Sequence, residues 1–282
     1  MLNFFKRRKK DPKAELEELF KDYELPSFPV AVMNVLTALR NPDFSMNKVS
    51  KILEGDPGLH VKVLKTVNSA AFGLTKRVSN IHHAVTLLGR SRLETIVLSQ
   101  AVNKTLPEVD YPFFNMRQFW LTSARRASLA RTLANHIHPA TEVEAFTSGL
   151  LQDMALPILV TIKTREYEKI MQSWSSDKES DLTVFEQEHL GYDHSYVGAL
   201  IAEKWDLPDY LINAIAGHHN SDEIQIEPAI ELVSHIRGDT VEVTTEKLED
   251  LCVEKFGMNK EMVIEMVRTA FEDAEELSKI LR

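Results

Sequence analysis

Apolar residues recur at helical spacing along almost the whole of this 282-residue chain, and this pattern limits the fold more than any other feature of the sequence. Val32, Val35, Leu36 and Leu39 share one helix face, and similar spacing recurs beyond a proline-containing stretch at 106–112. No region sustains the two-residue alternation of a half-buried strand. The sequence therefore predicts an all-α protein without a sheet of three or more strands.

Interruptions in the helical pattern divide the chain into four segments. The stretch Leu106-Pro-Glu-Val-Asp-Tyr-Pro112 contains two prolines and polar residues, so it is the expected boundary between two helical lobes. The four expected segments are a basic leader with a short helix (1–24), an N-terminal lobe of short helices (25–110), a C-terminal helical bundle (111–238) and an acidic helical extension (239–282).

Local signals predict where several helices begin and end. Asp56 followed by Pro57 is a cap residue plus a first-turn proline, which is a strong start signal. Thr183, with Glu186 three residues later, predicts a capping box. Pro157 is expected to kink a helix or to start a new one.

Composition indicates a soluble chain in a reducing compartment. The apolar fraction of 44% is sufficient for a core, and the single cysteine, Cys252, excludes an internal disulfide framework. No uninterrupted apolar run approaches the roughly 18 residues of a membrane span, and no hydrophobic signal segment follows the N-terminal charges. We therefore expect a cytoplasmic protein without a transmembrane segment.

The net charge of −9 is unevenly distributed. Residues 239–282 contain 12 acids and 6 bases, which gives this segment a charge of −6. This balance argues against nucleic-acid binding, which needs a basic surface. The exception is Lys6-Arg-Arg-Lys-Lys10 after Phe4-Phe5, which could make weak contact with an anionic membrane surface or could be a solvated leader.

Asp153, His194, His218 and His219 are residue types that hold zinc, iron or manganese in a helical pocket. The residue before Asp153 is Gln152, whose neutral amide is a poor ligand. We expect the four to converge, with Asp153 accepting a hydrogen bond from an imidazole. They are weak candidates for metal ligands, and the sequence predicts neither a bound metal nor another cofactor.

The stretch from Ala145 to Val160 resembles the signature of the HD-superfamily phosphohydrolases, in which His-Asp is followed two residues later by Gly-Lys. Here these positions hold Gln152-Asp153 and Ala155-Leu156. The resemblance implies that Asp153 is retained from a metal site, whereas a histidine and a lysine have been replaced.

Two further positions of that resemblance also differ. In the superfamily a histidine usually lies two residues after a tryptophan, and here Thr122 follows Trp120 at that spacing. The last aspartate of the superfamily corresponds to His235 in Leu232-Val-Ser-His-Ile236. The resemblance therefore implies a remnant pocket, without catalytic residues, that could bind a ligand. Its expected members are Thr122, Gln152, Asp153, His194, His218, His219 and His235.

The front half of the chain is similar to the HDOD family, the non-catalytic relatives of the HD hydrolases. The similarity is carried by Leu25-Pro-Ser-Phe-Pro29, Asp56-Pro57-Gly58, Asn68-Ser-Ala-Ala-Phe-Gly73 and Ala84-Val-Thr-Leu-Leu-Gly89. It implies a two-lobed, all-α module with an HD-like second lobe. Such a module is expected to act without catalysis in bacterial signalling, by binding a signalling protein partner or a small ligand.

A second function stays open, namely a metal-dependent phosphohydrolase or cyclic-dinucleotide phosphodiesterase of the HD superfamily. Such an enzyme needs a metal-activated water and a group that manages protons or charge. The chain has Leu156 in place of the family lysine. It has Asn220-Ser-Asp-Glu223 after its histidine pair, where the cyclic-dinucleotide subgroup has Gly-Tyr-Pro. We therefore expect no enzyme activity.

Overall fold

The computed structural model describes residues 12–21, 23–69, 77–177 and 179–281, and over these residues the chain is all-α. The two strands among them, β1 (Asp110–Tyr111) and β2 (Phe114–Asn115), form one antiparallel pair. The predicted fold class is confirmed. The first strand of this short hairpin lies within the proline-containing stretch 106–112, at which the lobe boundary was predicted, and the second strand follows it.

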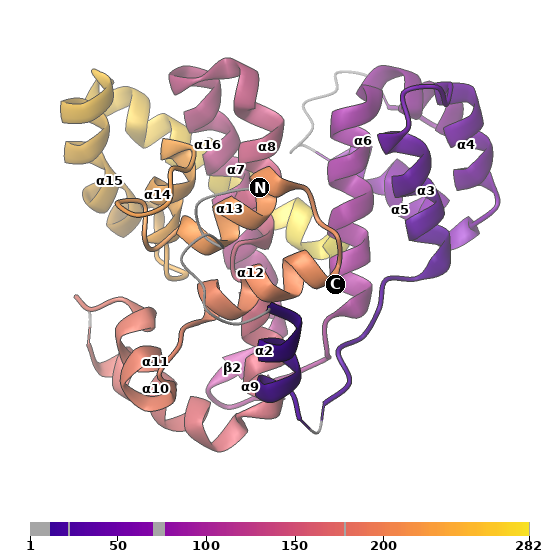
Figure 1. Cartoon of the computed structure of the whole chain (residues 1–282). Coiled ribbons are helices and arrows are strands. Elements are labelled where there is room, and N and C mark those ends of the chain that lie inside the picture. The colour runs from indigo at the N-terminus through magenta and orange to yellow at the C-terminus, as the bar shows by residue number, and fades with distance from the viewer. Residues whose placement is uncertain (1–11, 22, 70–76, 178, 282) are drawn as a thin grey trace.

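The helices form a right-hand group and a larger left-hand group in Figure 1. They are α2 (Pro12–Leu19), α3 (Val30–Arg40), α4 (Met46–Glu54), α5 (Pro57–Val67), α6 (Ile81–Thr105), α7 (Met116–Ile137), α8 (Glu142–Leu151), α9 (Ala155–Ile162), α10 (Thr164–Ser176), α11 (Leu182–Leu190), α12 (His194–Lys204), α13 (Asp209–Gly217), α14 (Pro228–Ser234), α15 (Val241–Phe256) and α16 (Lys260–Leu281). A 3-10 turn at Pro139–Thr141 precedes α8.

The right-hand group consists of α3 to α6, and its helix boundaries follow the local sequence signals. Asp56 caps α5 by accepting a hydrogen bond from the backbone N–H of Leu59 at 2.8 Å, with Pro57 in the first turn. Gly89 interrupts α6 with a φ of 68°, a left-handed conformation that glycine adopts without steric cost. The predicted start of α5 is confirmed.

The left-hand group is built around α7, against which α8, α14 and α16 pack. Within the acidic segment, α15 and α16 pack on each other, and α16 also packs on α7 and contacts α5 and α6. Two of its acids face arginines of α7: Asp273 lies 3.6 Å from Arg131 and Glu275 lies 3.8 Å from Arg125. Part of the negative charge of residues 239–281 is therefore paired with arginines of α7.

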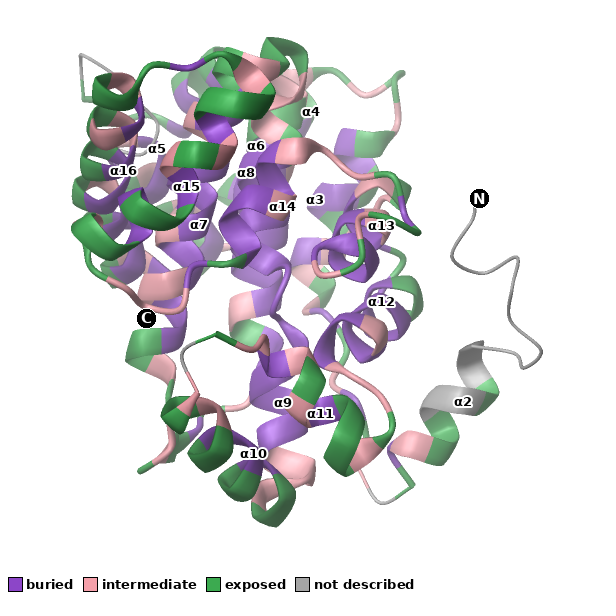
Figure 2. Ribbon diagram, turned by 90° about the vertical axis from the view of Figure 1, so that its left-hand side faces the viewer, coloured by how far each residue is buried: buried purple, intermediate pink, exposed green. Residues whose placement is uncertain are grey.

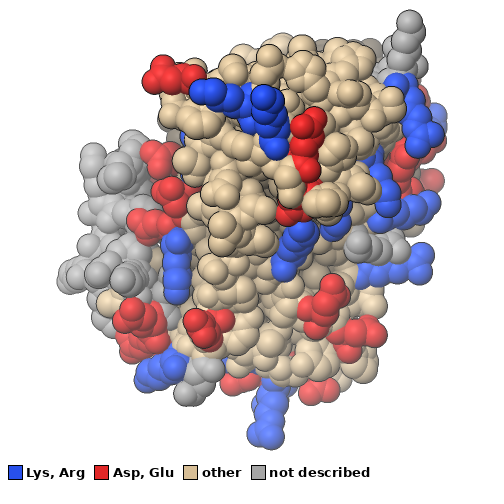
Figure 3. Space-filling model, turned by 90° about the vertical axis from the view of Figure 1, so that its right-hand side faces the viewer, with Lys and Arg blue, Asp and Glu red and all other residues tan. Residues whose placement is uncertain are grey.

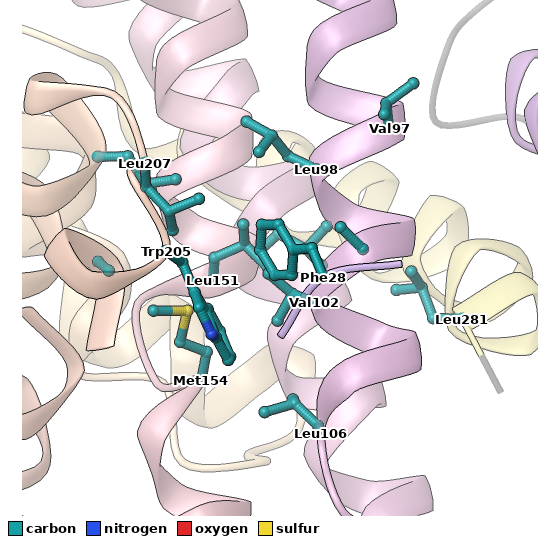
Figure 4. Packing of buried hydrophobic residues seen from close by; sticks show 14 of the residues in the cluster. Phe28, Val97, Leu98, Val102, Leu106, Leu151, Met154, Trp205, Leu207 and Leu281 are labelled. Carbon is teal, nitrogen blue, oxygen red and sulfur yellow. The ribbon is translucent and has the colours of Figure 1, made fainter. Parts of the chain in front are cut away.

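One continuous hydrophobic cluster joins the two groups (Figure 4). Trp205, at the end of α12, packs against Phe28 with ring centroids 4.9 Å apart. Its indole N–H donates to the carbonyl of Pro26 at 2.9 Å. Leu151 of α8 and Val102 of α6 belong to the same cluster. Because the groups share a core, movement of one of them is resisted by apolar contacts with the other.

The stretch Pro139–Ile162 is apolar and long enough to span a membrane by length and composition, which the sequence analysis did not anticipate. In the fold, 89% of its most apolar window is buried, and Figure 2 shows α8 and α9 as buried helices. This burial is typical of a core helix in a soluble protein. The helix is interrupted by a turn at 152–154, and α9 begins after it. Pro157 lies in the first turn of α9, where no backbone N–H is needed.

Polar groups of the right-hand group serve mainly to satisfy backbone atoms. Asn68 bonds the carbonyls of Leu64 and Val78, each at 2.7 Å, and Arg90 donates to the carbonyls that end α3. On the face in Figure 3, Lys and Arg are interspersed with Asp and Glu over a largely uncharged surface. The basic cluster Lys6–Lys10 lies outside the described residues.

Candidate functional site

The turn between α8 and α9 carries Asp153 into the interior, and a glycine makes this possible. Gly149 lies so close to α7 that a Cβ there would be 2.9 Å from the carbonyl oxygen of Arg126. This close approach brings α8 against α7, and Asp153, one turn later, reaches the Arg126 side chain. Asp153 is 7% exposed.

Arg126 is the main partner of Asp153. Its guanidinium donates to Asp153 Oδ2 and is itself 7% exposed. It also donates to the carbonyl of Ile236 from Nε at 3.1 Å and from Nη2 at 2.6 Å, and to the carbonyl of Ser234 at 3.3 Å. The arginine is thus fixed between a carboxylate and the C-terminal end of α14, where carbonyl dipoles favour a cation.

A chain of buried hydrogen bonds positions His194 at the start of α12. Tyr167 donates its hydroxyl to Glu186 Oε1 at 2.6 Å, and Glu186 Oε2 lies 2.7 Å from Nδ1 of His194. The predicted capping box is wrong. Asp181 caps α11 by accepting from the Thr183 N–H, and this leaves Glu186 free to turn inward.

His218 and His219 end α13 and complete the cluster. His218 Nδ1 lies 2.8 Å from the carbonyl of Ile215, which can only accept, so this nitrogen carries a hydrogen. His219 Nδ1 lies 3.1 Å from Asp181 Oδ2. One potential ligand atom from each of Asp153, His194, His218 and His219 lies within 4.8 Å of the others. The structure therefore brings the four predicted residues together.

The pKa values of the two buried histidines, His194 and His218, are shifted in opposite directions. Burial lowers the pKa of His194, but Glu186 and Asp153 outweigh it and raise the pKa well above its usual value. Burial and the neighbouring His219 lower the pKa of His218 to about 3. His194 is therefore an imidazolium whose Nε2 N–H donates to the neutral His218 Nε2 at 3.2 Å.

The Asp153 carboxylate is ionised in this environment. Burial raises its pKa, but Arg126, with smaller contributions from the two histidines, holds the net pKa well below the ordinary value. Its Oδ1 faces His218 Nε2 at 3.2 Å and His194 Nε2 at 3.5 Å. The expected hydrogen bond from an imidazole is not formed with hydrogen-bond geometry among the described residues, and the main partner of the carboxylate is a guanidinium.

These opposite shifts predict that the combined contribution of the two histidines to folding stability is largest near pH 6.5, the ordinary pKa of both. The contribution of His218 is complete above pH 6.5 and is lost as the pH falls toward 3, because only the unfolded state then takes up a proton. The contribution of His194 is complete below pH 6.5 and is lost as the pH rises toward its raised pKa. The free energy of unfolding is measured with urea across this pH range. We expect it to depend less on pH below 6.5 in His218→Gln, and less on pH above 6.5 in His194→Gln. An unchanged pH dependence in both variants would contradict these protonation states.

A cavity of about 180 Å³ opens beside the cluster. Asp153, His194 and His219 line it, together with Arg126, and His218 lies behind them with a fully buried side chain. Aromatic and aliphatic side chains form much of the remaining wall: Phe113, Phe114, Phe119, Leu156, Met171, Trp174 and Leu182. The cavity thus combines an apolar wall with a charged floor, which is typical of a small-molecule site.

Three other predicted members have different positions. Thr122 lines the cavity. His235 does not; it is an exposed residue just after α14, and the preceding Ser234 faces the cavity instead. Consecutive helical residues point about 100° apart, which accounts for Ser234 lining the cavity while the next residue does not. Gln152 does not line the cavity either, and its buried amide has no hydrogen-bond partner among the described residues.

The four side chains are of the types that bind a divalent transition metal, but the charged group beside them does not favour one. Three imidazoles and a carboxylate are common zinc or manganese ligands. However, Asp153 is already paired with Arg126, and a divalent ion bound by this carboxylate would lie close to a guanidinium that repels it by several kcal/mol at an effective dielectric constant near 20. The site as it stands does not fit a metal.

Arg126 and Glu186 were not among the site residues predicted from the sequence. Arg126 was detectable in principle, because it falls on the same helix face as Ser123, Ala130 and Ala134, which are small and buried. A cation on such a face requires a buried partner. Glu186 had no such signal, since its spacing from Thr183 matched a capping box.

Comparison with known proteins gives consistent results. A family model described as the HDOD domain matches residues 25–221. An uncharacterised protein of Treponema pallidum (strain Nichols) is 26% identical over 198 residues, which cover 70% of this chain and 38% of that protein. The chain thus spans less than half the length of this relative.

Solved structures share the fold over almost the whole chain. A candidate phosphohydrolase from Shewanella amazonensis SB2B has a TM-score of 0.76 at 24% identity, covering 96% of this chain and 98% of the other. A candidate signal transduction protein from Marinobacter aquaeolei VT8 has a TM-score of 0.72 at 19% identity, covering 98% and 62%. An HDOD domain protein of unknown function from Geobacter sulfurreducens has a TM-score of 0.70 at 19% identity, covering 95% and 97%.

Proposed function

The chain belongs to the HDOD domain family, and from this premise we propose that it is a non-enzymatic regulatory module of bacterial signal transduction. It acts in the cytoplasm by binding a protein partner or a small ligand. The HD-like fold and the likeness to a candidate signal transduction protein support a signalling-related domain. The details of the site support the absence of catalysis.

The observation that carries this proposal is that the cluster neutralises its own charges. Asp153 pairs with Arg126, His194 pairs with Glu186, and His219 faces Asp181. A phosphohydrolase of this superfamily needs a metal-activated water and a group that stabilises developing charge. At the position of the family lysine, the apolar Leu156 lines the cavity. The charged side chains of the site are therefore paired with one another, which leaves them less available to bind a substrate.

The cavity is the candidate site for a small ligand. Trp174 lines it, and within the part of the chain that the structure describes its buried indole N–H has no hydrogen-bond partner. An unsatisfied buried donor costs free energy that a ligand with an acceptor can recover. The aromatic wall of Phe113, Phe114 and Phe119 offers a stacking surface. These features favour a small ring-bearing ligand with an acceptor group.

The outer face of α15 is the candidate surface for a protein partner. Glu242, Glu246, Asp250 and Glu254 are exposed and spaced four residues apart, so they lie on one face of the helix. This acidic stripe favours a basic partner, because complementary charge speeds encounter and fixes orientation. Nucleic acid, which is itself anionic, does not suit it.

The alternative is a metal-dependent phosphohydrolase or cyclic-dinucleotide phosphodiesterase. It is favoured by the convergence of three imidazoles and one carboxylate. The test is hydrolysis of cyclic dinucleotides and of a generic phosphodiester with added manganese or iron. We expect turnover below about 0.1 per second, under the usual range of enzymes. Metal-dependent turnover above this value would establish the hydrolase in place of the module.

Partner capture tests the positive side of the proposal. The chain and a variant with Glu246→Lys, Asp250→Lys and Glu254→Lys are compared as baits in a bacterial lysate at low and high salt. We expect a specific protein that the native chain retains at low salt and releases at high salt, and that the variant does not retain. Equal capture by both baits would show that α15 is not the contact surface.

A further inference from the structure

We propose that Arg126 takes the place of a divalent metal in the cluster of Asp153, His194, His218 and His219, and that its removal converts this cluster into a transition-metal site. The inference deepens the proposed function, on which it rests, by assigning the absence of metal chemistry to one residue. It concerns binding alone and requires no turnover.

The imidazoles are already held as metal-binding histidines are held. Such histidines usually direct one ring nitrogen to a carboxylate or a backbone carbonyl, which orients the other toward the metal. His194 Nδ1 contacts Glu186 at 2.7 Å, His218 Nδ1 contacts the carbonyl of Ile215 at 2.8 Å, and His219 Nδ1 contacts Asp181 at 3.1 Å. The same arrangement thus occurs three times and leaves the three Nε2 atoms available to the cluster.

The carboxylate is the shared element. Asp153 Oδ1 lies 3.2 Å from His218 Nε2 and 3.5 Å from His194 Nε2, whereas its Oδ2 accepts from Arg126. Oδ1 is buried, and no well-oriented hydrogen bond from residues 12–21, 23–69, 77–177 or 179–281 satisfies it. The carboxylate therefore balances the guanidinium on one side and presents an open acceptor to the imidazoles on the other.

Arg126 cannot easily move aside to admit a metal. Its side chain is buried, and Nε and Nη2 both donate to the carbonyl of Ile236, with a further bond to that of Ser234. Displacing it would leave a buried cation and two carbonyls without partners, which is strongly unfavourable. A divalent ion would therefore have to bind beside a fixed positive charge. The guanidinium excludes the metal for the same reason that it stabilises Asp153.

The experiment compares metal content in Arg126→Gln with the native chain and with Arg125→Gln. The adjacent Arg125 is a matched control, because its guanidinium bonds the carbonyl of Asp239 and lies over the ring of Phe271, away from the four residues. Tag-free proteins are dialysed against zinc or manganese and then against buffer, and the bound metal is measured by mass spectrometry. We expect about one equivalent of zinc in Arg126→Gln and an affinity at least about 100-fold above that of both other proteins.

Loss of the arginine could also unfold Arg126→Gln, and circular dichroism with and without zinc tests the proposal in that case. If Arg126→Gln is unfolded in chelator, addition of zinc is expected to restore its helical circular dichroism, because metal binding then stabilises the native state. Adding Asp153→Asn to Arg126→Gln should abolish both binding and rescue. A folded Arg126→Gln without metal, an unfolded one that zinc does not rescue, or a native chain that holds one equivalent would each overturn the proposal. None of these results requires turnover, so each is distinct from failure of the proposed function.

Discussion

Replacing Asp153 with alanine is expected to lower the free energy of unfolding by about 3 to 5 kcal/mol, because it leaves the buried Arg126 cation without its counter-charge. The protonated His194 loses a neighbouring anion at the same time. The effect is measured by urea unfolding at neutral pH. An exposed aspartate after the histidine pair, Asp222, is the control, and its replacement by alanine should change stability by no more than about 0.5 kcal/mol.

A double variant separates lost charge pairing from lost packing. Arg126→Met combined with Asp153→Leu removes both charges and fills the space with apolar groups, and buried pairs replaced in this way often lose little stability. We expect the double variant to recover most of the loss caused by Asp153→Ala. If Asp153→Ala costs less than about 1 kcal/mol, the pair does not contribute to the fold as its burial implies.

Trp205→Ala is expected to cost about 3 to 5 kcal/mol, since it removes a large buried side chain from the core that joins the two helical groups. Trp205→Phe is the milder comparison. It keeps an aromatic ring against Phe28 and loses the hydrogen bond to the carbonyl of Pro26, for which about 1 kcal/mol is expected. Figure 4 shows the indole near Leu151 and Met154, with Phe28 beside it.

The same measurement shows whether the two groups unfold as one unit. Tryptophan fluorescence and helical circular dichroism are followed together in urea, and coincident transitions indicate a single cooperative unit. We expect coincidence in the native chain, because apolar contacts link the segment around Phe28 to α8 and α12. Two separated transitions would instead support lobes that fold independently on either side of the hairpin.

The sequence determined the fold class because it depends on local periodicity. The apolar spacing of Val32, Val35 and Leu36 identifies a helix without reference to any other part of the chain, and all three are buried in α3. Asp56 and Pro57 specified a helix start for a similar reason, since a cap acts within four residues. The membership of Asp153 and the three histidines in one site came from the family resemblance.

The tertiary structure alone decided which groups these residues meet. Arg126 reaches Asp153 because Gly149 allows α8 to approach α7, and that distance is not encoded in the spacing of either residue. Glu186 bonds His194 because Asp181 takes over the cap of α11. Ser234, the last residue of α14, faces the cavity and His235 does not, because the packing of α14 sets the rotation of this helix about its own axis. Charge pairing in a buried site depends on contacts between elements far apart in the chain, and local sequence patterns do not fix those contacts.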